Sequence, residues 1–116
     1  MASYKELIVW QRSIDLVVAV YRATEGLPIG ERYALCDQMR RAVVSIPSNI
    51  AEGHARETKK EFRHFLLIAS GSLAELETQL IVCERVGFLS SVVIHMLLEK
   101  IEEIRKMIVG LSKTLL

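Results

Sequence analysis

The fold of this chain is decided by residues 40–80, RRAVVSIPSNIAEGHARETKKEFRHFLLIASGSLAELETQL. Thr58-Lys59-Lys60-Glu61 has the pattern of a capping box, in which Thr58 is the N-cap of a following helix. Gly53 stands where a helix favours a left-handed terminating residue. Before Gly53, apolar residues recur at the spacing of one helix face, at Leu35, Met39, Ala42, Val43, Ile46 and Ile50. We therefore predict a helical hairpin that turns between Gly53 and Thr58.

Pro47 interrupts the first arm of this hairpin. Proline has no N–H to donate to the carbonyl of Val43, and it disfavours α geometry at Ile46. A continuous, kinked helix is one interpretation. The other is a new short helix that has Pro47 in its first turn.

The second arm is apolar on two faces. One stripe follows steps of three and four through Phe62, Phe65, Leu66, Ala69, Leu73, Leu76, Leu80 and Cys83. The other comprises Leu67, Gly71, Ala74, Thr78 and Ile81, mostly small residues that permit close approach by another helix. Such a helix is central in its fold, or it shares its faces between an intramolecular core and a subunit interface.

The rest of the chain predicts two more helices. The first runs from Ser3 or Tyr4 to Thr24, and its narrow seam is Leu7, Trp10, Ile14, Val17 and Tyr21. The connection 26–30 leads to a helix from Glu31 to Glu52, and the third helix runs from Lys59 to Val86, with Gly87 as its stop. A fourth helix, capped by Ser90 or Ser91, buries Val93, Leu97, Ile101, Ile104, Ile108, Leu111 and Leu115. The predicted fold is all-α, a single domain over residues 1–116 with the course of an antiparallel up-down-up-down four-helix bundle.

The composition and the cysteine pattern predict a cytoplasmic protein. The net charge is +1 and hydrophobic residues make up 51% of the chain, a mild excess that favours oligomerisation. Cys36 and Cys83 are embedded in apolar periodicity, as expected of buried thiols in a reducing compartment. No signal peptide is recognisable, and no window approaches the roughly 18 uncharged apolar residues of a membrane span.

The sequence supports no enzymatic site, cofactor or metal. The three histidines, His54, His64 and His95, are not spaced as a ligand set. Ser72 lies inside a helical stripe and not at a nucleophile elbow, so we interpret it as a small packing residue. No phosphate loop, nucleotide fingerprint or zinc spacing is present.

The basic residues concentrate around the hairpin turn. Between residues 40 and 64 there are six basic and three acidic residues, whereas residues 65–84 carry three glutamates and no Lys or Arg. The basic residues are Arg40, Arg41, Arg56, Lys59, Lys60 and Arg63. They form either an ordinary solvated surface or an anion-binding end, which the symmetry of an oligomer would multiply into a ring of positive charge.

Several blocks of the sequence also resemble a known protein family. The most specific block is Ser48-Asn49-Ile50-Ala51-Glu52-Gly53, and further matches are Val9-Trp10-Gln11, Arg40-Arg41-Ala42, Glu61-Phe62 and residues 71–80. Over residues 4–90 the chain closely resembles the four-helix-bundle proteins encoded in 23S ribosomal RNA intervening sequences. Ala34 stands where a glycine is common, and Thr58 where a serine is common.

The resemblance implies a bacterial, cytoplasmic bundle that assembles into a ring-shaped homopentamer. It also implies kinship with the accessory variability proteins of diversity-generating retroelements, which bind nucleic acid and a reverse transcriptase through a basic surface. Asn49, Glu52 and Gly53 are then structural residues of the kink and turn, and the six basic residues are candidate nucleic-acid contacts. We thus expect a non-enzymatic oligomer that binds structured RNA or other nucleic acid. The alternative is a protein–protein adaptor whose partner docks on the exposed apolar stripe.

Overall fold

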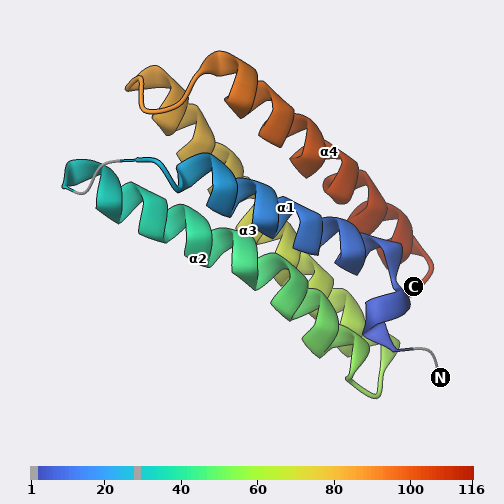
Figure 1. Ribbon diagram of the computed structural model, residues 1–116. Coiled ribbons are helices and arrows are strands. Elements are labelled where there is room, and N and C mark those ends of the chain that lie inside the picture. The colour runs from blue at the N-terminus through green and yellow to red at the C-terminus, as the bar shows by residue number, and fades with distance from the viewer. Residues whose placement is uncertain (1–2, 28–29) are drawn as a thin grey trace.

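The computed structural model describes residues 3–27 and 30–116, which form four helices and no strand. A 3-10 turn, η1 (Tyr4–Glu6), precedes α1 (Ile8–Thr24), α2 (Glu31–His54), α3 (Lys59–Arg85) and α4 (Ser91–Lys113). The helices pack as an elongated bundle of 44 × 21 × 20 Å. In Figure 1 the connection between α2 and α3 lies at the same end as both termini, and the other two connections lie at the opposite end. Pro28 and Ile29, part of the connection predicted from sequence, lie outside the described residues.

The ends of α3 and α4 follow the local signals of the sequence. The Thr58 hydroxyl accepts from the backbone N–H of Glu61 at 3.1 Å and donates to the Glu61 carboxylate at 3.3 Å. Ser90 accepts from the N–H of Val93 at 3.3 Å and so caps α4. Gly87 has a φ of 78°, the left-handed conformation that ends α3 as predicted.

The core contains the predicted faces of α2, α3 and α4. The buried hydrophobic side chains of these helices include Met39, Val43, Ile46, Ile50, Leu66, Leu73, Leu76, Leu80, Leu97, Ile101 and Ile104. The first predicted stripe of α3 is buried from Leu66 to Cys83.

The predicted seam of α1 is wrong about which residues are fully buried, although Leu7, Trp10 and Val17 pack against the core. The buried residues of this helix are Val9, Ser13, Leu16, Val20 and Thr24. Ser13 and Thr24 can be buried because their hydroxyl groups donate to the carbonyls of Val9 and Val20, at 2.7 and 2.8 Å. The predicted seam lies to one side of this face, and its members are half-buried except Tyr21, which is 41% exposed. The predicted start is also modified, because residues 4–6 form a separate 3-10 turn.

Helix α2 continues through Pro47, so the interpretation as two helices is wrong. Polar side chains beside the proline bond to the backbone one turn earlier. Ser48 donates to the carbonyl of Val44 at 2.9 Å, and Asn49 donates to that of Ser45 at 2.7 Å. These side chains thus supply donors to two backbone carbonyl groups in the turn of α2 that precedes Pro47.

Gly53 does not end α2 in the left-handed conformation, which corrects the prediction. It lies inside the helix, which continues to His54, and its φ is not positive. A Cβ atom built on Gly53 would lie 2.6 Å from the Cβ of Phe65 and 3.0 Å from Cδ1 of Phe62. The glycine is required because α2 and α3 approach each other closely at this end of the hairpin.

Candidate nucleic-acid interface

The turn between α2 and α3 presents Arg56, Lys59 and Lys60 to solvent, and we call these three residues the turn surface. Lys59 and Lys60 are the first two residues of α3, directly after the N-cap Thr58. Cations are unfavourable at a helix N-terminus, where the helix dipole already supplies partial positive charge. The lysines therefore add to the positive potential of this end and do not help to stabilise the helix.

The two lysines are free to bind an anion. In the part of the chain that the structure describes, neither forms an ion pair or a side-chain hydrogen bond. Arg56 is more constrained, because its guanidinium donates to Glu52 at 2.9 Å and lies 4.9 Å from the ring centre of Phe65. Its side chain nevertheless remains 44% exposed.

Arg63 connects α3 to the end of α4. Its Nη1 donates to the backbone carbonyl of Leu115 at 3.0 Å, and the side chain is half-buried. Leu115 lies just beyond the C-cap Thr114, so this contact ties the segment after α4 to α3. Arg63 lies beside the turn surface, but the bond to Leu115 occupies part of its guanidinium.

Arg40 and Arg41 lie away from the turn surface. They precede the end of α2 by 13 or 14 residues, about 20 Å along a helix. Arg40 donates to the Thr24 hydroxyl at 3.1 Å and to the carbonyl of Tyr21 at 3.4 Å, and its guanidinium lies 4.6 Å from the centre of the Tyr21 ring. Arg41 pairs with Asp37 at 3.0 Å. The structure thus brings together four of the six predicted residues. Of the other two, Arg40 contacts α1, and Arg41 pairs with a residue one turn earlier on α2.

A groove between α3 and α4 adjoins the turn surface, and the sequence reasoning missed it. It has a volume of about 590 Å³ and is lined by Lys60, Arg63, His64, Leu67, Ser70, Ile108, Val109, Ser112, Lys113 and Leu116. No Asp or Glu is among these residues. Lys113 was missed as a further cation at this end. The signal was present in the sequence, because a long fourth helix that returns beside the third must bring its last turn near residues 60–64.

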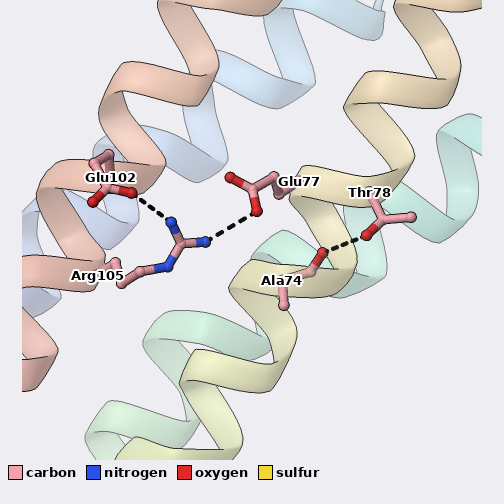
Figure 2. Close-up of polar contacts among 5 residues, drawn as sticks. All are labelled: Ala74, Glu77, Thr78, Glu102 and Arg105. Carbon is pink, nitrogen blue, oxygen red and sulfur yellow. Dashed lines mark hydrogen bonds and ion pairs between the residues drawn. The ribbon is translucent and has the colours of Figure 1, made fainter.

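Beyond this groove, charged side chains join α3 to α4. Figure 2 shows Arg105 of α4 between Glu77 of α3 and Glu102 of its own helix. The distance between Arg105 and Glu77 is 3.2 Å, and both side chains are about one-third exposed. This cation is therefore balanced by two carboxylates, whereas Lys60 and Lys113 in the groove lining form no ion pair with a described residue.

The second apolar stripe of α3 faces outward. Leu67 is 70% exposed, and a Cβ atom on Gly71 would meet nothing within 4 Å. The Thr78 hydroxyl donates to the carbonyl of Ala74 at 2.9 Å on the side of α3 away from Arg105, so its donor is satisfied within the helix (Figure 2). The bundle covers only one of the two apolar faces predicted for this helix.

Its two apolar faces also give α3 the composition of a membrane-spanning helix. By length and composition alone α3 could cross a membrane, although one face of it forms the core of the bundle. This refines the prediction that no stretch of the chain approaches such a composition.

Other side chains that could carry chemistry are dispersed or buried. No group of three His, Cys, Asp or Glu within residues 3–27 and 30–116 could hold a metal ion. Burial raises the pKa of the Cys83 thiol, and the nearby Cys36 raises it further. A raised pKa lowers the thiolate fraction and with it the reactivity of the thiol. Ser72 accepts a hydrogen bond from Ser45 across the packed helices α2 and α3.

Comparison with known proteins identifies one family and one fold. The family model of 23S rRNA-intervening sequence proteins matches residues 5–110. A solved structure with a TM-score of 0.81 is a protein of unknown function from the S23 ribosomal protein family of Bacteroides thetaiotaomicron. The two chains are 22% identical, and the match covers 91% of this chain and 99% of the other. No curated protein sequence matches this chain.

Proposed function

The chain belongs to the family of 23S rRNA-intervening sequence proteins, and from this premise we propose that it is a non-enzymatic, cytoplasmic protein that binds structured RNA or other nucleic acid. The binding site is the turn surface, with Arg63 beside it. One observation carries the proposal: Lys59 and Lys60 are unpaired cations at the N-terminus of a helix. Free backbone N–H groups and the helix dipole favour phosphate at such a position.

The arrangement of charge favours recognition of a backbone over recognition of bases. Phosphate contacts from Lys and Arg position a nucleic acid without specifying its sequence. The turn surface has no Asn, Gln or aromatic group among its three residues, and the guanidinium of Arg56, which could contact a guanine edge, is already paired with Glu52. We therefore expect affinity that varies little with sequence and depends strongly on salt.

The test compares a double variant with a matched control. Lys59→Gln/Lys60→Gln should weaken binding to a structured ribosomal RNA fragment and lower the salt slope by about one unit per lost contact. The control, Lys100→Gln/Lys106→Gln, removes two lysines from α4 and should leave affinity and slope as in the wild type. Arg63 stays intact, because its bond to Leu115 would confound stability with binding. Equal affinities and equal slopes for all three proteins would refute this function.

We also propose that the antiparallel bundle assembles into a ring-shaped homo-oligomer, a homopentamer by family resemblance. Beyond the groove, the uncovered small residues Gly71, Ala74 and Thr78 of the outer stripe of α3 support this assembly, since they admit a close helix. Because Gly71 faces outward, Gly71→Arg should yield smaller but folded species, whereas Gly110→Arg on α4 should not change the size. Light scattering from a wild-type monomer at micromolar concentration would exclude the assembly.

A second candidate function is that of a protein–protein adaptor. The same exposed stripe of α3 favours it, and the turn surface would then have no role. Capture of a protein partner that is insensitive to salt, with no measurable RNA affinity, would identify this function.

A further inference from the structure

The floor of the α3–α4 groove is apolar and open to solvent. Leu67 is 70% exposed and Val109 is 48% exposed, while Ile108 forms the base at 3%. Ser70 and Ser112 are the small residues of the lining. Along α3 the groove extends from Lys60 to Ser70, about 15 Å or nearly three helical turns. A groove of this length between two helices fits the apolar face of a third.

Charge is distributed unequally along the groove. Lys60, Arg63, His64 and Lys113 line it near the turn surface, and no Asp or Glu side chain accompanies them in the lining. Farther along α4, the charge of Arg105 is balanced by Glu77 and Glu102, and Lys106 does not line the groove. A molecule bound in the groove therefore gains affinity from negative charge only at its end nearest the turn surface.

From this complementarity we propose that the α3–α4 groove binds an amphipathic helix of a partner protein, with apolar side chains on the floor and carboxylates facing Lys60 and Lys113. The proposal goes beyond nucleic-acid binding at the turn surface. It shares Lys60 with the turn surface, but it rests chiefly on Val109 and Lys113 of α4. Failure of either proposal leaves the other standing.

Two other occupants of the groove, a nucleic acid and a second copy of this chain, fit it less well. A nucleic-acid backbone has no apolar surface to place on Leu67 and Val109, and the one ring in the lining, His64, already lies edge-on to Phe65 at 5.7 Å. A second copy of this chain would need an apolar and acidic helix face. The outer face of α4 has such a pattern in Val92, Met96, Glu99 and Glu103, but Glu103 is paired with Arg12 at 3.1 Å.

The experiment uses two labelled synthetic peptides of about 14 residues, long enough to fill the groove as a helix. Both carry Leu at helical spacing, and the flanking positions are Glu in one and Lys in the other. Fluorescence anisotropy measures their affinity for the full chain and for Val109→Glu and Lys113→Glu. Matched controls on α4, Val92→Glu and Lys106→Glu, place the same changes outside the groove.

We expect the Glu peptide to bind the wild type about tenfold more tightly than the Lys peptide. Val109→Glu should weaken the Glu peptide about tenfold, because it places a carboxylate on the apolar floor. Lys113→Glu should weaken the Glu peptide and tighten the Lys peptide, a gain that a misfolded variant cannot produce. Both controls should stay within about twofold of wild type.

Several results would overturn the proposal. The first is equal affinity for the two peptides, or no saturation below about 1 mM. The second is weakening by the α4 controls as large as that by Val109→Glu. If Val109→Glu instead divides a wild-type oligomer into smaller species, the occupant is a second copy. If it abolishes binding of the ribosomal RNA fragment, the occupant is nucleic acid.

Discussion

Replacing Gly53 by alanine tests whether close contact between α2 and α3 sets the geometry of the hairpin. The new Cβ would lie 2.6 Å from the Cβ of Phe65, about 1 Å inside the usual carbon–carbon contact distance. Both atoms are attached directly to backbone, so no side-chain rotation separates them. The helices must move apart where Phe62 and Phe65 pack, which costs about 2–3 kcal/mol, the upper part of the range for overpacking.

Alanine also stabilises a helix relative to glycine, by about 1 kcal/mol. The net effect of Gly53→Ala is then a loss of about 1–2 kcal/mol in the free energy of unfolding. The entropy of unfolding is about 2.1 cal/mol/K per residue, so a chain of 116 residues loses about 4–8 °C in melting temperature.

The assay is thermal unfolding followed by circular dichroism at one fixed protein concentration, since self-association would make the melting temperature depend on concentration. Gly110→Ala is the matched control, because a Cβ atom on Gly110 meets nothing within 4 Å. This variant should gain up to about 4 °C from helix propensity alone. If Gly53→Ala is stabilised as much as Gly110→Ala, the close approach does not constrain the hairpin and the reasoning is wrong.

Three further predictions concern α2, α4 and the buried thiols. Pro47→Ala restores a backbone donor in α2 and should give a folded protein with altered assembly; unchanged oligomer size and unchanged thermal stability together would contradict a shaping role. Arg63→Gln removes the bond to the Leu115 carbonyl and should cost about 1 kcal/mol in denaturant titration, whereas a loss no larger than the roughly 0.5 kcal/mol of a surface change would show that the contact is not stabilising. The pKa of Cys83 is raised above its ordinary 9.0 by burial and then by Cys36, so the unfolded chain loses this proton first and the free energy of unfolding should fall as pH rises past about 9. Cys83→Ala should flatten that fall, and an unchanged pH slope would contradict it.

Local signals in the sequence were sufficient for most of the fold. Thr58, Ser90 and Gly87 act on residues within one turn of themselves, so their roles could be predicted without tertiary information. Gly53 was misassigned because a left-handed turn and a close helix contact both require glycine. Only the position of Phe65 on the other arm distinguishes them.

The seam of α1 was mispredicted for a different reason. Apolar periodicity excludes Ser13 and Thr24 from a core, yet each hydroxyl donates to a carbonyl one turn earlier and is buried without loss. Bulky residues such as Trp10 marked a face that the bundle covers only in part.

The candidate site was predictable where it depends on neighbours in sequence. Lys59 and Lys60 follow a cap that the sequence reveals, so their place at the start of a helix was predictable. Arg40 was not, because its partners Thr24 and Tyr21 lie 16 and 19 residues earlier, on another helix. Lys113 was predictable from the length of the fourth helix, which returns its last turn to the start of α3.

The contacts of Arg40 make the connection between α1 and α2 a suitable place to insert foreign sequence. The side chain fastens the end of α1 to α2 through Thr24 and Tyr21, so the two helices do not depend on a short linker for their alignment. Lengthening a connection costs little, about 0.6 kcal/mol for each doubling of its length. A fluorescent reporter or affinity handle placed there would sit at the opposite end of the molecule from the turn surface (Figure 1), where it would leave the proposed binding sites accessible.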